Sequence, residues 1–447
     1  AASCGRGGGM IRQGVGAIRE MYGLTRGLGN LRVMLGSGLL GMAASGLLNP
    51  VMPLYLRSRG LGFQEIGALY TVGALLPIFV QPVLGALSDR HGRKPFVVGL
   101  SLVTSLMVPA VALVDDPQPL AAVMILKMLL SRSAAPVSNA MVADFAPARQ
   151  RATLFALLDA TSNLVFVAAL FASSAVIRAL SVAGTFFLAG GLFLAGSLLL
   201  LGLDEPARPP RAEAVRGGAG AAWGLVFRGL LSPFTYVKDR PGAAALFLWQ
   251  FFFTFALALF PTYLPLYAVE LGAPREAVGP LVAASWLTYA FAQPFGGRLS
   301  DRLSRRVGMI VPGLAGMAVM AAVLGAAGWL PNGAALMTLV GAWVLLAIPD
   351  GLHRSSASAL VVEQSPAPSE RGRFMGALGA CGALASVLAP VTYGFVAQAA
   401  GIGSTFLISS VSLVLALGCV SRVREASSHA TPEPAPVAAL TPTSEPG

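Results

Sequence analysis

Twelve long apolar segments follow one another along the chain and leave little of it able to face water. A helix needs about 20 residues to cross ~30 Å of hydrocarbon, because each residue advances it by about 1.5 Å. Segments of about that length or longer cover residues 33–56, 63–87, 95–114, 119–143, 152–177, 183–203, 242–268, 277–299, 307–329, 333–361, 373–398 and 402–421. Only 11% of the residues are charged, against roughly 25% in soluble domains. We therefore expect an all-α membrane protein with twelve transmembrane helices.

The net charge of +11 reflects where the basic residues fall relative to these segments. Of the 31 Lys and Arg residues, 24 lie on the side of the two termini, 4 on the other side and 3 within segments. Positive residues collect on the cytoplasmic side of membrane proteins. The distribution predicts a multi-pass protein of the plasma (inner) membrane with both termini in the cytoplasm. Because topology explains the charge, we expect no nucleic-acid partner.

The boundaries of the apolar segments divide the chain into five parts. We expect a basic cytoplasmic segment at 1–32, six-helix bundles at 33–204 and 242–421, a cytoplasmic linker at 205–241 and a disordered Pro-rich tail at 422–447. The three cysteines, Cys4, Cys381 and Cys419, lack the spacing of a disulfide framework or a metal site. No catalytic triad or phosphate-binding loop appears. The sequence therefore predicts no enzyme, no metal and no cofactor.

The two bundles are related in sequence. A shift of 212 residues aligns polar and proline positions that apolar composition alone would not match. Pro53-Leu54-Tyr55 falls on Pro265-Leu266-Tyr267, Gly67 on Gly279, Gln81-Pro82 on Gln293-Pro294, Ser88-Asp89-Arg90 on Ser300-Asp301-Arg302, and Arg93 on Arg305. Both halves begin on the same side, so they form a parallel repeat. Such repeats are related by an axis along the membrane normal, with the binding site at the midplane between them.

The connection after the second segment carries a family signature. Residues 85–94 read GALSDRHGRK, and residues 297–306 repeat the pattern as GRLSDRLSRR, with Ser304 in place of the second glycine. These loops resemble the signature G-x-L-[AS]-D-R-x-G-R-[KR] of the major facilitator superfamily, and the resemblance covers about residues 33–421. It implies two six-helix bundles that work by alternating access.

In that family the loop charges latch the cytoplasmic side and are broken and remade during transport. The resemblance assigns gating to Gly85, Asp89, Arg90, Arg93 and Asp144, and in the second half to Gly297, Asp301, Arg302, Arg305 and Glu363. We expect the two glycines to allow close helix approach. The alternative is that the charges only fix topology and form surface pairs, each contributing ~0–1 kcal/mol.

Two ionisable residues lie deep in the fourth and fifth segments. Arg132 and Asp159 lie at similar depths, so adjacent antiparallel helices would bring them together. A charge at that depth costs about 2.5–3.5 kcal/mol or more and needs a reason. Arg132 resembles the arginine associated with proton coupling in drug antiporters, although Pro136 replaces the usual glycine. We predict a coupling pair, with a static helix-to-helix pair as the alternative.

A second charged cluster lies in the tenth segment, at Asp350, His353 and Arg354. Positions i and i+4 share a helix face, so Asp350 and Arg354 can pair, and a histidine beside a carboxylate can exchange protons near neutral pH. The resemblance places this helix at the central cavity. We predict a substrate or proton site, with a structural pair as the alternative. Lys127, nearer the outer end of its segment, is expected to snorkel.

These features predict a secondary active transporter, with proton-coupled efflux of small amphipathic compounds favoured. The seventh segment is rich in aromatic residues, which favours apolar ligands unless these side chains face lipid. They are Trp249, Phe251, Phe252, Phe253 and Phe255. An importer or facilitator of a polar metabolite, such as a sugar or an organic acid, remains open because the helix 5 glycine–proline signature of drug antiporters is missing. A membrane sensor on a transporter-like scaffold is the remote alternative. The expected partners are a small-molecule substrate, protons and the lipid bilayer, and we expect a monomer.

Overall fold

A computed structural model describes residues 29–146, 151–205, 219–303, 306–366 and 368–423, and the regular structure within these ranges is helical. The first bundle contains α2 (Gly29–Leu48), α3 (Val51–Ser58), α4 (Phe63–His91), α5 (Lys94–Leu113), α6 (Pro117–Phe145) and α7 (Arg151–Leu199). The second contains α9 (Ala244–Leu257), α10 (Phe260–Glu270), α11 (Val278–Leu303), α12 (Val307–Ala326), α13 (Asn332–Glu363), α14 (Pro368–Ala400) and α15 (Ile402–Val420). The linker helix α8 (Ala219–Asp239) lies between them in the chain. Short 3-10 turns cover Leu200–Gly202, Pro241–Ala243, Arg275–Ala277 and Ala327–Trp329.

The described helices account for the predicted twelve crossings. Ten stretches are long and apolar enough to span a membrane, and one of them, Leu157–Gly202, contains two crossings. It reverses at Ser181, whose φ of 64° and ψ of 175° are not helical. The remaining crossing is α11, which has the position expected for the eighth helix. The predicted all-helical, two-bundle fold is confirmed.

The first crossing of each bundle is broken into two helices. The break separates α2 from α3 at residues 49–50 and α9 from α10 at residues 258–259. Proline lacks an N–H, so the carbonyl four residues earlier loses its helical partner. Pro53 removes the partner of Asn49, and Pro261 removes that of Leu257. A proline shortly after each break therefore loosens the backbone where the two bundles meet, although Pro53 and Pro261 do not correspond in the repeat.

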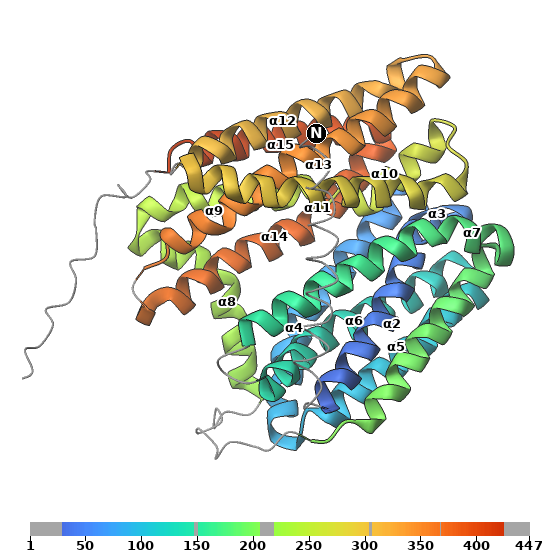
Figure 1. Ribbon diagram of the computed structural model, residues 1–447, viewed down its shortest axis with the longest axis vertical. Helices are drawn as coiled ribbons and strands as arrows, with labels where there is room; N and C mark the ends of the chain where they lie inside the picture. Colours follow the sequence, from blue (N-terminus) through green and yellow to red (C-terminus); the bar gives the residue numbers. More distant parts are fainter. Residues whose placement is uncertain (1–28, 147–150, 206–218, 304–305, 367, 424–447) are drawn as a thin grey trace, which may run out of the picture.

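Within each bundle the helices pack in a fixed set of neighbours. In the first bundle α7 packs on α2 and α5, while α6 packs on α4 and α5. In the second, α13 packs on α11 and α12, while α15 packs on α9 and α12. The bundles contact each other through α4 with α14, α7 with α11, and α3 with α10. Figure 1 shows them converging at α3 and α10 on the right, while α4 and α14 diverge toward the left.

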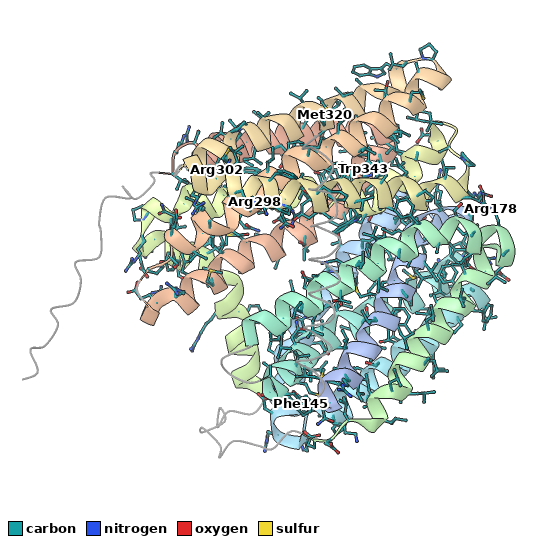
Figure 2. All side chains as sticks on the ribbon, in the orientation of Figure 1. Phe145, Arg178, Arg298, Arg302, Met320 and Trp343 are labelled. Atoms are coloured by element: carbon teal, nitrogen blue, oxygen red, sulfur yellow. The ribbon has the colours of Figure 1, made fainter. Side chains whose placement is uncertain are left out.

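We name the two ends of the molecule by their charge. The basic end is where α4 joins α5 and α11 leads to α12, and Arg298 and Arg302 lie toward it; the opposite end holds the turn at Ser181, with Arg178 near it (Figure 2). At the basic end, α8 packs on α14 and, more lightly, on α4. Two ion pairs, Arg240–Glu370 at 2.5 Å and Arg373–Asp239 at 2.6 Å, link the end of α8 and the residue after it to α14. The sequence predicts only a linker at this place.

Candidate functional site

A cavity of about 230 Å³ lies at the junction of the bundles. The break after α2 contributes Asn49, and the rest of the wall comes from the second bundle. That wall consists of Leu257, Phe260, Pro261, Leu264, Pro265, Val282, Ser285, Trp286, Tyr289, Trp343, Leu346, Ala347, Asp350 and Arg354. It is mainly aromatic and aliphatic, with a few polar groups at defined places, which is typical of small-molecule sites.

The charged part of this wall is the pair on α13. Arg354 Nε donates to Asp350 Oδ1 at 3.1 Å, so the predicted i, i+4 contact forms. The Asp350 side chain is 16% exposed and that of Arg354 is 45% exposed. The guanidinium also lies 5.7 Å from the ring centres of both Phe253 and Tyr289. Aromatic faces thus hold the arginine beside its carboxylate at the cavity.

His353 does not belong to this wall. It is fully buried, and its ring lies 4.4 Å from the Phe253 ring and 5.7 Å from the Trp249 ring. Both ring nitrogens are buried and have no hydrogen-bond partner among the residues that the structure describes. On the α12 side, a Cβ placed on Gly313 would lie 2.9 Å from His353 Cβ, so the backbone there is tight. The expectation that His353 lies beside the ion pair in the site is wrong, because one residue's step along the helix turns it by about 100° into the bundle.

The aromatic residues of the seventh crossing also lie elsewhere than expected. Trp249 and Phe253 contact His353, and the ring of Phe255 lies tilted against that of Tyr393 with their centres 5.1 Å apart. None of the five predicted aromatics lines the cavity. Its aromatic wall instead comes from Phe260, Trp286, Tyr289 and Trp343, on three different helices. Sequence spacing within one helix carried no signal for that convergence.

Arg132 and Asp159 do not form the expected pair. Within the described residues, no ion pair joins them, because α6 packs on α4 and α5 whereas α7 packs on α2, α5 and α11. Asp159 accepts a hydrogen bond from Asn163 at 3.2 Å and lies in electrostatic range of Tyr289 on α11. Sequential helices were assumed to be spatial neighbours, and here they are not. Asp159 therefore approaches the second bundle and its cavity wall.

Pro136 has a structural consequence next to Arg132. Proline at this position leaves the carbonyl of Arg132 without its helical N–H partner. The side-chain amide of Gln81 on α4 donates to that oxygen at 3.0 Å. The replacement of the expected glycine is thus compensated by a contact between α4 and α6.

The predicted charge cluster of the first bundle forms at the basic end. Arg93 lies 3.2 Å from Asp89 and 2.8 Å from Asp144. Glu205 accepts hydrogen bonds from the backbone N–H groups of Arg93 and Lys94, at 2.7 and 3.1 Å, a contact that the motif did not predict. Arg90 is exposed and contributes no recorded ion pair in the described residues.

The corresponding cluster of the second bundle uses a different arginine. Glu363 accepts from Arg306 Nε at 3.0 Å, and Arg306 also donates to Ser300 at 3.0 Å. Arg305 and the side chain of Asp301 lie outside the described part, and Arg302 is exposed. Every ion pair recorded at the basic end for described residues lies within one bundle or ties the α8 region to α14.

The signature glycines do not make the expected close contacts. A Cβ on Gly85 would meet nothing within 4 Å, and one on Gly297 would be 3.7 Å from the nearest atom, Ser355 Cβ. The prediction is wrong for this conformation, in which α4 and α14 diverge at the basic end (Figure 1). The tight approach lies one residue earlier in the second bundle, where a Cβ on Gly296 would be 2.6 Å from Leu352 Cα.

The opposite end is closed by contacts between the bundles that the motifs did not reveal. A Cβ on Gly67 would be 2.3 Å from Pro390 O, and one on Gly279 would be 1.9 Å from Ser173 Oγ. Both glycines therefore allow contact across the junction, α4 with α14 and α11 with α7. The correspondence of Gly67 and Gly279 in the repeat was the feature of the sequence that could have indicated these contacts. We call Gly67, Gly279 and their contacts the closed junction.

Hydroxyl groups hold the closed junction together. Thr71 Oγ1 donates to Val387 O at 2.8 Å and accepts from the N–H of Val391 at 3.1 Å, bridging one turn of α14. Tyr263 Oη, from α10, lies 3.1 Å from Pro390 O and 3.3 Å from Phe63 O. These bonds join the two bundles at one end while the basic end stays apart.

Comparison with known proteins agrees with this architecture. The model of the Major Facilitator Superfamily matches residues 34–285 and 246–445. The chain is 21% identical to an uncharacterized MFS-type transporter of Methanocaldococcus jannaschii over 384 residues, 86% of this chain and 95% of that one. It is 29% identical to the multidrug resistance protein MdtG of Escherichia coli over 165 residues, 36% of this chain and 38% of that one. The crystal structure of the nucleoside transporter NupG superposes with a TM-score of 0.68 at 15% identity, covering 89% of this chain and 100% of NupG.

Proposed function

The chain belongs to the Major Facilitator Superfamily, and on that premise we propose that it exports small amphipathic compounds in exchange for protons. Members of the family are transporters of small molecules, so the chain is a multi-pass membrane transporter and not an enzyme. We propose the direction of transport, the substrate class and the coupling ion.

The observation that carries it is the cavity at the bundle junction. Its aromatic wall, with Phe260, Trp286 and Trp343, suits an apolar ring system, and its charged pair lies at one side. A site that buries an apolar body and orients it by one or two polar groups is suited to amphipathic ligands. The similarity of part of the chain to MdtG, a multidrug resistance protein, supports export.

We place the basic end in the cytoplasm of the inner membrane, with both termini on that side, and treat the protein as a monomer. The excess of basic residues at this end supports the orientation. The closed junction then faces outward, and the described conformation is the one that receives substrate from the cytoplasm. Alternating access requires the closed junction to open while the signature clusters around Arg93 and Glu363 approach the other bundle.

Proton coupling is assigned to Asp159 and Asp350. The two carboxylates approach Tyr289 from different bundles, since both lie in its electrostatic range. Rocking of one bundle against the other changes the surroundings of each carboxylate, and with them its affinity for a proton. Arg354 belongs to this group through its bond to Asp350. His353 is in electrostatic range of Arg354 but does not line the cavity, and we assign it to packing.

The second candidate is import or facilitated passage of a polar metabolite. Asn49, Ser285 and the Asp350–Arg354 pair give the cavity several hydrogen-bonding groups. The NupG structure is that of a nucleoside transporter with the same fold, which supports a polar substrate as the alternative.

Flux in reconstituted liposomes tests the proposal. Purified protein is screened against a panel of amphipathic and polar compounds, with and without an imposed pH gradient. We expect amphipathic compounds to accumulate against their concentration gradient only when the pH gradient is present. Asp350→Asn serves as the coupling-deficient comparison, and Lys238→Gln, on the exposed surface of α8, as the matched control. Flux of every responding compound without regard to the gradient would reject proton coupling.

A further inference from the structure

Helix α6 carries two basic side chains deep inside the membrane-spanning region. Lys127 and Arg132 follow the start of the helix at Pro117 by ten and fifteen residues, or about 15 and 22 Å along its axis. In the described part of the chain, neither the ammonium of Lys127 nor the guanidinium of Arg132 has a recorded ion pair or hydrogen bond. An unpaired charge at this depth is costly and points to function.

Arg132 is exposed and Lys127 is half-buried, at positions about 140° apart around α6. Ser131, Ala135 and Asn139, which follow Lys127 at helical spacing, are exposed, as is Arg132. Met128, between the two cations on the helix surface, is buried and packs against Gly73 of α4. Lys127 is in electrostatic range of Arg132. The expectation that Lys127 snorkels to the outer interface stays a prediction.

A tyrosine connects this pair to the closed junction. Tyr70 on α4 is in electrostatic range of Arg132 and of Tyr263. It lies one residue before Thr71, whose hydroxyl bridges α14. Arg132, with Lys127 in its electrostatic range, therefore lies where α6 packs on the part of α4 that reaches the closed junction.

The acidic groups of the region are engaged elsewhere. Asp350 is bonded to Arg354 at 3.1 Å, and Asp159 accepts from Asn163 near Tyr289. Helix α6 thus carries two positive charges in mutual electrostatic range without a described protein anion to balance them. A bound anion would relieve their repulsion, and guanidinium geometry suits a carboxylate or phosphate-like oxyanion.

We propose that Lys127 and Arg132 form a binding subsite for an anionic group of the substrate, which is therefore an amphipathic organic anion. The apolar body of that anion lies against the aromatic wall with Trp286 and Trp343, and its oxyanion points toward α6. The proposal rests on the transport function proposed above, since it names the class of compound that the transporter accepts.

Binding of three probes of similar shape tests the subsite. The probes are 1-naphthoate, 1-naphthamide and 1-naphthylmethylammonium, which are anionic, neutral and cationic. Equilibrium dialysis with the purified full-length protein measures their affinities. We expect naphthoate to bind about tenfold or more tighter than naphthamide, the size expected for a charged hydrogen bond, and the cation to bind most weakly.

Variants locate the effect on α6. Lys127→Gln and Arg132→Gln should each weaken naphthoate binding by about tenfold or more and leave naphthamide binding unchanged. Lys127→Arg should retain the preference for the anion. Lys238→Gln removes one positive charge from the exposed face of α8 and should change nothing. Melting temperature reports on folding, and Lys127→Met should keep or raise it because no described protein anion loses a partner.

The outcomes separate the subsite from the transport proposal. Equal affinities for the three probes, no naphthoate binding at millimolar concentration, or unchanged binding in both Gln variants would overturn the subsite. If naphthoate binds through Lys127 and Arg132 but no compound is driven by the pH gradient, the subsite stands and the coupling proposal falls. If gradient-driven flux is seen without any preference for anions, the reverse holds.

Discussion

Replacement of Gly67 by alanine should open the end of the molecule that is closed here. The added Cβ would lie 2.3 Å from Pro390 O, 2.9 Å from Tyr263 Oη and 3.1 Å from Gly394 Cα. Ordinary contact begins at 3.4 Å, so α14 must retreat by about 1 Å, and backbone atoms cannot rotate away as a flexible side chain can. The other conformation of the transport cycle, in which the junction is apart, carries no such clash.

The bonds across the junction set the size of the effect. Three of them join the bundles: Thr71 to Val387 at 2.8 Å, Val391 to Thr71 at 3.1 Å and Tyr263 to Phe63 at 3.3 Å. A retreat of about 1 Å breaks them, and each contributes about 1 kcal/mol. A loss of about 2–3 kcal/mol shifts the ratio of the two conformations by a factor of about 30 to 150.

Spin-label distances across this end measure that shift. Labels at Ser58 and Ala399, both exposed and on different bundles, report the separation in lipid nanodiscs. We expect a longer distance to become populated in Gly67→Ala. Gly279→Ala should act in the same direction, because its Cβ would lie 1.9 Å from Ser173 Oγ and 2.6 Å from Leu170 O.

Gly99→Ala is the matched control, since a Cβ at that position would meet nothing within 4 Å. It should leave the distance distribution as it is in the unmodified protein. A distribution unchanged in Gly67→Ala and Gly279→Ala, with both proteins folded by melting temperature, would refute the assignment of these glycines to the junction.

Three further outcomes are expected. Asp350→Asn and Asp159→Asn should each abolish gradient-driven flux per folded molecule while substrate exchange in liposomes persists; normal gradient dependence in both would end the coupling assignment, and a parallel fall in melting temperature would indicate structural pairs. Asp89→Asn should favour the conformation with the basic end apart, but only slightly, since the Asp89 side chain is 59% exposed and such a pair contributes ~0–1 kcal/mol. Asp301→Asn should act less. If inter-bundle distances change in neither variant, both loops only fix the topology. His353→Phe should keep or raise the melting temperature without altering gradient dependence, because it removes two buried ring nitrogens that lack partners; lost coupling in a folded variant would restore a proton role for His353.

Much of the fold was predictable because membrane insertion fixes the length and polarity of each helix. The twelve crossings follow from the lengths of the apolar segments. The breaks in the first and seventh crossings follow from Pro53 and Pro261. Local charge contacts were also predictable: Asp350 with Arg354 from helix spacing, and Arg93 with its two carboxylates from the shared depth of helix ends.

What could not be predicted is which helices become neighbours. The pairing of Arg132 with Asp159 assumed that consecutive helices pack together, and α6 and α7 do not. The residues of the cavity wall could not be predicted for the same reason, since Phe260, Tyr289 and Trp343 converge from separate helices. The role of Gly85 depends on the conformation, because a signature contact between bundles is absent when that end is apart. The remaining gating and coupling assignments stay predictions.

The repeat separates the mechanical parts of the molecule from its chemical parts. Gly67 and Gly279 correspond at a shift of 212 residues, and each lies at a close approach between bundles, so the closed junction is duplicated. The clusters at the basic end are duplicated as well, with Asp144 and Glu363 at a shift of 219. The charges inside the membrane are not. At either shift, the counterparts of Lys127 are Leu339 and Leu346, and those of Arg132 are Val344 and Gly351.

Asp350 likewise corresponds to Ser138 or Ser131, neither of which is charged. Two equivalent bundles suffice for a rocking motion, because each end must be able to close, and selection on that motion preserves both copies of the contact. A single substrate lying across the pseudo-symmetry axis meets a different wall on each side. Its anionic end and its coupling proton therefore require charges in one bundle that the other does not repeat. The absence of symmetry at Lys127, Arg132 and Asp350 supports their assignment to substrate and proton rather than to the opening and closing of the two ends.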